Sequence, residues 1–123
     1  MTHHVDRFLA AVTALARHGH IKQRLIKAYE DNLADISEDE LPIVLKEPFT
    51  DLKQRMYRVS PLNGEGPICA SVRKMSIDEA SDCATAIVSL YDELVRCSEK
   101  AEVTLVSDGE ERVGVPPFLV KSN

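Results

Sequence analysis

The stretch between residues 76 and 98 constrains the fold more than any other part of the sequence. It begins with Ser-Ile-Asp-Glu, in which Ser76 and Glu79 have the spacing of a helix capping box. Apolar or small residues then recur three and four positions apart, as on one face of a helix. The residues of this predicted seam are Ile77, Ala80, Ala84, Ile87, Tyr91 and Leu94. A helix with such a face needs other helices to cover it, so the chain is expected to be mainly helical.

Three further segments carry the same helical spacing of apolar residues. One ends before Gly19, and the other two span residues 20–36 and 48–59; a short helical turn is expected at 38–46. Pro48 is expected to separate this turn from the helix over residues 48–59, because proline disrupts a helix interior. Residues 60–75, which contain two glycines and two prolines, read as a long connector. The predicted fold class is therefore all-α: a four-helix bundle-like single domain.

The C-terminal part of the sequence has a different pattern. In "AEVTLVSDGEERVGV", alternating apolar residues flank a Ser-Asp-Gly turn, which is typical of a β-hairpin. Chain ends are also where order is often lost. We therefore expect a helical bundle domain over residues 1–98, with residues 99–123 appended as a hairpin or a mobile tail.

Composition and length narrow the class of protein. The chain has 123 residues, which fits one domain. No apolar run approaches the roughly 20 residues that span a bilayer, and the start of the chain lacks an export leader. Its three cysteines are widely spaced, which argues against a disulfide framework. A cytoplasmic location is the expectation.

Charge is unevenly distributed along the chain. Residues 17–27 carry four basic and no acidic residues, a net charge of +4. Residues 53–74 carry five basic residues against one glutamate, again +4. Since the whole chain has a net charge of -5, the remainder sums to -13. Two basic segments in an acidic protein indicate either a site for an anionic partner or two solvated faces of opposite charge.

The predicted helix over residues 20–36 has its charges in an unfavourable order. Its basic residues come early and its acids late, opposite to what the helix dipole prefers. This order suggests that something compensates the basic end of the helix, either an anionic partner or neighbouring parts of the fold. The candidate anion- or nucleic-acid-binding residues of the two basic segments are Arg17, Lys22, Arg24, Lys27, Arg55, Arg58, Arg73 and Lys74.

Motifs for catalysis and for cofactors are not found. Gly64 and Gly66 lack the following Gly-Lys of a phosphate-binding loop, and the chain has no Glu-x-x-His or His-Glu-x-x-His. No serine or cysteine has the sequence context of an activated nucleophile. We expect no cofactor and no metal. Whether the protein is an enzyme stays uncertain, with the balance against it.

Three hypotheses for function follow. The first is a small non-enzymatic interaction or regulatory module that binds a protein partner and self-associates, as a homodimer, through its helical surfaces. The second is a nucleic-acid-associated regulator that uses the basic segments 17–27 and 53–74, with a strong dependence on salt. The third is a small ligand-binding or enzymatic helical bundle. No membrane association is expected.

Overall fold

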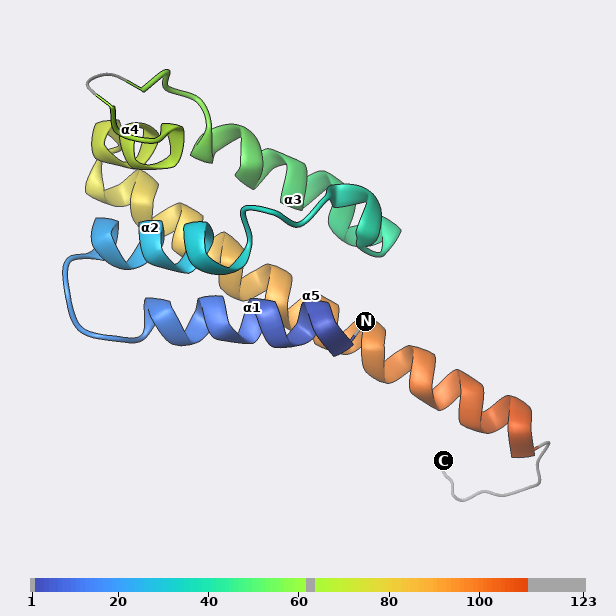
Figure 1. Ribbon diagram of the computed structural model, residues 1–123. Helices are drawn as coiled ribbons and strands as arrows, with labels where there is room; N and C mark the ends of the chain where they lie inside the picture. Colours follow the sequence, from blue (N-terminus) through green and yellow to red (C-terminus); the bar gives the residue numbers. More distant parts are fainter. Residues whose placement is uncertain (1, 62–63, 111–123) are drawn as a thin grey trace.

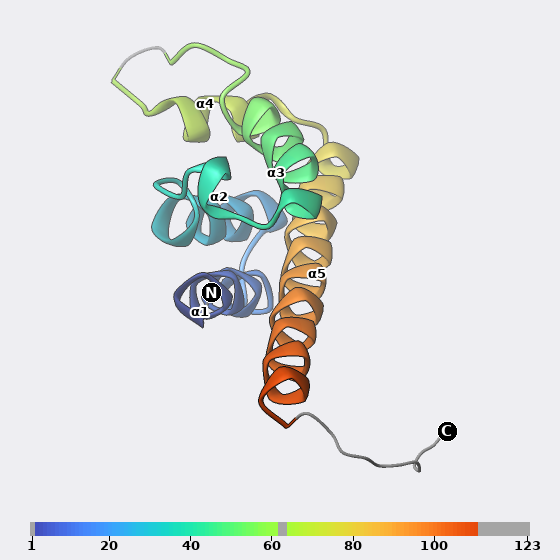
Figure 2. The ribbon, with the colours of Figure 1, turned by 90° about the vertical axis from the view of Figure 1, so that its right-hand side faces the viewer.

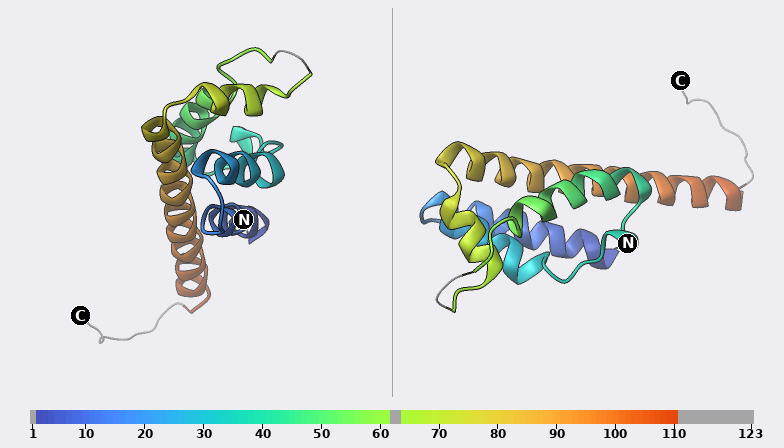
Figure 3. Two further views of the ribbon diagram at one scale, coloured as in Figure 1. Left: turned by 90° about the vertical axis from the view of Figure 1, so that its left-hand side faces the viewer. Right: turned by 90° about the horizontal axis from the view of Figure 1, so that it is seen from above.

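The computed structural model describes residues 2–61 and 64–110 (Figure 1). Its elements are α1 (Thr2–Leu15), α2 (Ile21–Asn32), a 3-10 turn η1 (Glu38–Glu40), α3 (Ile43–Met56), α4 (Pro67–Lys74) and α5 (Ile77–Glu110). These residues include no strand, so the all-α fold class is confirmed for them. Seen along α1, the helices α1, α2 and α4 are stacked beside α5, and α3 packs against the upper half of α5 (Figure 2, Figure 3).

One apolar core joins all five α-helices. Phe8 of α1 and Phe49 of α3 are fully buried and contact each other edge to face, with ring centroids 6.0 Å apart. The same cluster contains Leu25, Tyr29, Leu33, Leu45, Leu52, Met56, Val72, Cys83, Ile87 and Leu94. Because apolar burial is the main favourable term in folding, these helices stabilise one another as one unit.

The prediction that residues 60–75 are only a connector is wrong, because this segment contains α4. Pro67 lies in the first turn of α4, where its fixed φ and missing N–H favour a helix start. Val72 is fully buried, and the hydroxyl of Ser71 accepts a 2.9 Å hydrogen bond from the N–H of Val59. The described residues therefore contain five α-helices where four were predicted. A helix forms in this segment because it pairs backbone N–H and C=O groups that are partly buried.

The helix α2 is shorter than the predicted range of 20–36. It ends at Asn32, whose side-chain amide donates a 3.1 Å hydrogen bond to the carbonyl of Ala28. Asparagine favours helix ends because its side chain competes for backbone groups. Leu33 and Ile36 still reach the core from the turn and extended segment that follow.

The predicted turn at 38–46 and helix at 48–59 are replaced by η1 and a single helix, α3. Pro48 lies inside α3 and does not break it. A proline there cannot donate to the carbonyl of Val44, and that residue is exposed enough for water to reach it. The buried residues Leu45 and Phe49 lie on either side of Pro48 and hold the helix against the core.

The predicted start of α5 is confirmed. The N–H of Glu79 donates to Oγ of Ser76 at 3.1 Å, and the N–H of Ser76 donates to Oε1 of Glu79 at 2.9 Å. This is the reciprocal pair of a capping box. The bond from the Ser76 backbone lowers the pKa of the Glu79 carboxyl, which stays charged beside the positive end of the helix.

The buried face of α5 differs in part from the predicted seam. The seam residues that are buried are Ala80, Ile87 and Leu94. Ile77 is 50% exposed, and Ala84 and Tyr91 are half-buried. Leu90 and Cys83 lie on the buried face although the seam did not include them. The face is displaced because α1, α2 and α3 all pack against α5 and cover a wider stripe than one partner helix would.

The predicted C-terminal hairpin is not confirmed. The backbone of residues 101–110, which includes the first predicted strand and the Ser-Asp-Gly turn, belongs to α5. Once a helix is nucleated, each added residue gains one hydrogen bond, so extension competes well against a new turn. The predicted domain boundary between residues 98 and 99 therefore falls inside a continuous helix. Residues 111–119 of the predicted hairpin lie outside the described residues.

The acidic segment of residues 35–40, which follows α2 in the chain, is bound to α1 and α3 by its side chains. Each of its four carboxylates contacts a basic residue of one of these helices. Asp35 pairs with Arg7, Glu38 with Lys53 at 3.2 Å and Asp39 with Lys46 at 3.9 Å, and Oε1 of Glu40 lies 2.8 Å from Nε2 of His4. Ser37 caps η1 by accepting from the N–H of Asp39 at 3.3 Å. Exposed ion pairs contribute little to stability, so these contacts orient the segment more than they stabilise the fold.

Candidate functional site

An open cleft of about 590 Å³ lies between α1 and α2, beside the turn that joins them. Ala14 and Ile26 form its apolar part. The remaining lining residues are polar or charged: Arg17, His18, Gln23, Arg24, Lys27, Glu30 and Asp31. The cleft therefore contains three of the four predicted basic residues of segment 17–27.

The turn between α1 and α2 sets the width of the cleft. Gly19 has a φ of +115°, which glycine adopts far more readily than other residues. His20 follows as the N-cap of α2, and its Nδ1 accepts a 3.1 Å hydrogen bond from the N–H of Lys22. A cap satisfies one of the free N–H groups at a helix start, so α2 begins at a fixed point beside the end of α1.

Arg24 binds the end of α1. Its Nε donates to the carbonyl of Gly19 at 2.9 Å, and its Nη1 donates to the carbonyl of Leu15 at 2.5 Å. The last carbonyls of a helix have no partner within the helix, and arginine supplies one here. Arg24 was predicted as an anion ligand, but its guanidinium already has this structural role in the wall of the cleft.

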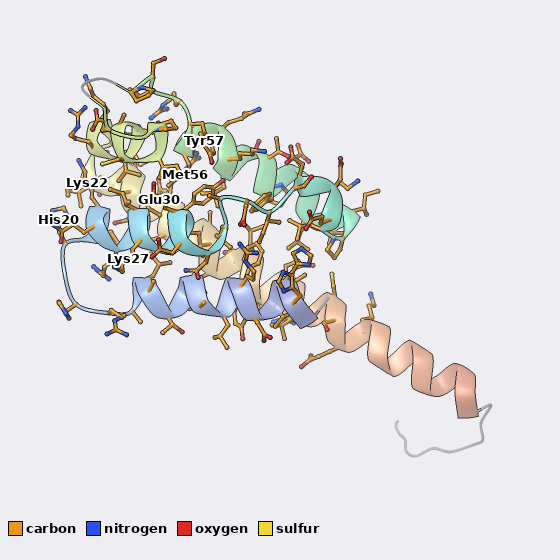
Figure 4. The ribbon with its side chains drawn as sticks, in the orientation of Figure 1. His20, Lys22, Lys27, Glu30, Met56 and Tyr57 are labelled. Carbon is orange, nitrogen blue, oxygen red and sulfur yellow. The ribbon has the colours of Figure 1, made fainter. Side chains whose placement is uncertain are left out.

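Arg17 and Lys27 have exposed side chains that form no ion pair or hydrogen bond within residues 3–61 and 64–100. Figure 4 shows Lys27 on the side of α2 that faces α1, whereas Lys22 points toward α4. Arg17 comes from the last turn of the α1 segment and Lys27 from the second turn of α2, and both line the same cleft. The cleft therefore presents two cations that are available to an anion.

Charge along α2 adds to this positive region. The first turn of α2 contains no acid, and its lysines and arginine precede Glu30 and Asp31. The amino end of a helix already carries a partial positive charge, so basic residues there raise the local potential further. An anion bound in the cleft would reduce this unfavourable accumulation of positive charge.

The sequence reasoning did not include four lining residues: His18, Gln23, Glu30 and Asp31. Helical spacing is the signal that could have found two of them. Gln23, Lys27 and Asp31 follow one another at intervals of four residues and so share one face of α2. Glu30 contributes to the lining, but its carboxylate lies toward α4, 3.9 Å from where a Cβ on Gly66 would be. The shared face has a cationic part and an acidic part.

The second basic segment does not extend the cleft. Lys22 of α2 donates from Nζ to the carbonyl of Arg73 at 3.2 Å, which places the two segments in contact at this point. Arg73 itself forms a two-point ion pair with Glu65, at 3.2 and 2.5 Å, and this pairing raises its pKa. Lys74 is exposed and has no ion pair in the described residues.

Arg55 and Arg58 lie elsewhere, in small hollows between α3 and α5 of about 240 and 280 Å³. Arg58 contacts Glu79 at 3.8 Å, and Nη1 of Arg55 lies 4.0 Å from the sulfur of Cys83. Burial raises the pKa of the Cys83 thiol, so the thiol stays protonated despite the neighbouring arginine. The eight predicted basic residues are thus divided among three places.

Within residues 2–61 and 64–110, no group of three or more histidine, cysteine or acidic residues has the arrangement of a metal site. Over the same residues, no helix combines the length and apolarity that crossing a bilayer requires. Comparison of the chain with protein-family models, with curated proteins and with solved structures finds no match.

Proposed function

We propose that the protein is a small interaction module that binds an anionic segment of a protein partner in the cleft between α1 and α2. The observation that carries this proposal is that Arg17 and Lys27, which form no ion pair within the described residues, line the same cleft as the apolar Ala14 and Ile26. Apolar residues combined with a few charged groups are the usual composition of a recognition site. The reversed charge order of α2 supports it independently, because it is a local electrostatic cost that an anion removes.

A binding role is favoured over a catalytic one by the lining of the cleft. Its described residues include one histidine and no serine, threonine, cysteine or tyrosine. Hydroxyl and thiol nucleophiles are therefore absent from this lining, and no hydrogen bond in the described residues joins its lysine or its carboxylates to a base. The cleft is better suited to bind a charged group than to catalyse its reaction.

The test is the binding of a short peptide containing two glutamates, compared with the same peptide containing two glutamines. We expect the glutamate peptide to bind wild-type protein and the double variant Arg17→Ala/Lys27→Ala to bind it about tenfold or more weakly, since hydrogen bonds to charged groups contribute about 1.5–3 kcal/mol. Titration followed by ¹⁵N–¹H NMR measures both the affinity and the residues that shift.

The matched control is Lys74→Ala/Lys100→Ala, which removes two exposed lysines outside the cleft and leaves the net charge equal to that of the cleft variant. It should bind like wild type apart from a small general effect of charge. If both double variants weaken binding equally, only net charge matters and the cleft is not the site. Equal binding of the glutamate and glutamine peptides contradicts the proposal outright.

The nucleic-acid alternative receives less support. A continuous basic surface is expected for backbone contacts to a polyanion. Arg73 and Arg58 are instead paired with Glu65 and Glu79, and Glu30 lies within the cleft itself. Binding of an oligonucleotide that is lost in Arg55→Ala/Arg58→Ala, and kept in Arg17→Ala/Lys27→Ala, would favour this alternative over the proposal.

We also propose that two copies associate through the exposed side of α5. In the described part of the chain, no other helix lies beside the last turns of α5, which project beyond the end of α1 (Figure 1, Figure 2). An isolated helix end is marginally stable in water, so a second copy offers a natural neighbour. Val88, on the packed part of α5, leaves 45% of its surface exposed.

Sedimentation equilibrium over a concentration series measures this association. Wild-type protein is expected to approach the mass of a dimer as concentration rises, and Val88→Asp is expected to remain monomeric, because it places a charge in an apolar contact. Leu9→Asp is the control, since Leu9 of α1 is equally exposed, at 45%. A wild-type monomer at every concentration, or equal loss in both variants, contradicts association through α5.

A further inference from the structure

The cleft between α1 and α2 has two poles of opposite charge. Arg17 and Lys27 form the cationic pole, and Asp31 forms the acidic pole one turn further along α2. Asp31 follows Lys27 by four positions, which is about 6 Å along a helix axis. The carboxylate of Glu30 lies apart from this pole, on the side of α2 toward α4 (Figure 4), 3.9 Å from where a Cβ on Gly66 would be. Asp31 forms no ion pair within the described residues. The acidic pole is therefore as available for binding as the cationic one.

The acidic pole limits which anions the cleft accepts. A long polyanion that contacts Arg17 and continues along α2 places negative charge against Asp31, which is repulsive. A compact anion at the cationic pole avoids that contact. If a positive group follows at a distance of about 6–7 Å, it meets the acidic pole, and two extended residues span this distance.

The donors at the cationic pole suit a dianion better than a single carboxylate. Arginine presents a planar fork of N–H groups, and lysine adds a compact charge with three donors. His18 lies beside them in the lining, and the amino end of α2 contributes its dipole from the same side. A phosphate monoester supplies a charge of about -1.5 to -2 and three acceptor oxygens, which matches several donors at once.

We propose that the cleft recognises a phosphorylated serine or threonine of a protein partner, followed two residues later by lysine or arginine. The phosphate contacts Arg17 and Lys27, and the basic side chain contacts Asp31. This inference rests on the proposed function, because it assigns the chemical class of the partner segment to the same cleft. In this arrangement Arg17 and Lys27 give the affinity, and the carboxylate of Asp31 gives the sequence preference.

The experiment compares three peptides by isothermal titration calorimetry with the full chain. The first is acetyl-Gly-pSer-Gly-Lys-Gly-amide, the second has glutamate in place of phosphoserine, and the third has norleucine in place of lysine. We expect the first peptide to bind about tenfold tighter than the second, and several-fold tighter than the third. Charge-assisted contacts of this strength account for such ratios.

The variant Asp31→Asn completes a double-mutant cycle. The side chain of Asp31 is exposed and keeps its size, so the fold is retained, and circular dichroism verifies this. In this variant the lysine and norleucine peptides are expected to bind equally, with the phosphate preference unchanged. If the norleucine peptide still binds as much more weakly than the lysine peptide as it does to wild type, the acidic pole does not contact the basic residue. The proposed sequence preference is then wrong.

The remaining outcomes separate this inference from the proposed function. Equal affinity for the phosphoserine and glutamate peptides overturns the phosphate assignment but leaves anion binding by the cleft intact. Inorganic phosphate that binds as tightly as the phosphopeptide overturns recognition of a partner segment and indicates a free phosphate or a small phosphate ester instead. If none of the peptides and no acidic peptide binds, both the inference and the proposed function fail.

Discussion

Replacing Phe49 with alanine is expected to lower the free energy of unfolding by about 3–5 kcal/mol, the usual loss when a large buried aromatic is truncated. Phe49 is fully buried and contacts the ring of Phe8 across α1 and α3. The change removes this contact and leaves a cavity in the core beside Phe8. For a domain whose total stability is about 5–15 kcal/mol, a loss of this size is a large fraction. Urea denaturation followed by circular dichroism measures it.

Two further variants of α3 control for this effect. Phe49→Leu keeps most of the apolar volume and is expected to lose less than half as much as the alanine variant. Ile43→Ala removes a side chain that is 81% exposed, and its effect is expected to stay within about 0.5 kcal/mol. Equal losses in Phe49→Ala and Ile43→Ala would mean that α3 does not pack on α1 as described.

Replacing Pro48 with alanine is expected to raise the free energy of unfolding by about 2 kcal/mol. Proline in a helix interior is about 3 kcal/mol less favourable than alanine. Alanine leaves the unfolded chain more conformational freedom than proline does, which reduces the gain by up to about 1 kcal/mol. The variant restores an N–H that can donate to the carbonyl of Val44. Pro48 is exposed, so little packing is lost in exchange. Thermal and urea denaturation both report the gain.

Pro42→Ala is the matched control, because Pro42 is the N-cap of α3 and has an extended ψ of 152°. No intrahelical hydrogen bond is gained there, so this change is expected to be neutral or to destabilise by up to about 1 kcal/mol. A loss of stability in Pro48→Ala would show that the ring of Pro48 contributes a contact worth more than the hydrogen bond.

The start of α5 could be predicted from sequence, while α4 could not, and the difference is physical. The capping box at Ser76 and Glu79 is a local arrangement, made by residues three positions apart. The helix α4 begins after glycines and prolines that resemble a loop, and its eight residues are too few to show a clear period. It forms because the apolar side chains around Val72 are buried by α2 and α3, which no local pattern reveals.

The candidate site was predictable in the same partial way. The basic residues of α2 and their unfavourable order are visible in the sequence, and they point to the correct end of the helix. Which of them remain available is a tertiary property: Arg24 and Lys22 bind carbonyls of other segments, while Lys27 does not. The acidic pole was missed because Asp31 was considered with the helix dipole and not with the face that it shares with Lys27.

The hydrogen bonds of Arg24 have a consequence for how a partner is bound and released. Because the guanidinium fastens the amino end of α2 to the carbonyls of Leu15 and Gly19, the walls of the cleft are held together before any partner arrives. Little conformational entropy is then lost from the protein on binding, and the entropic loss falls on the partner segment. Such a preorganised receptor forms its complex without an opening step, and the lifetime of the complex depends on how firmly its two charged ends are held.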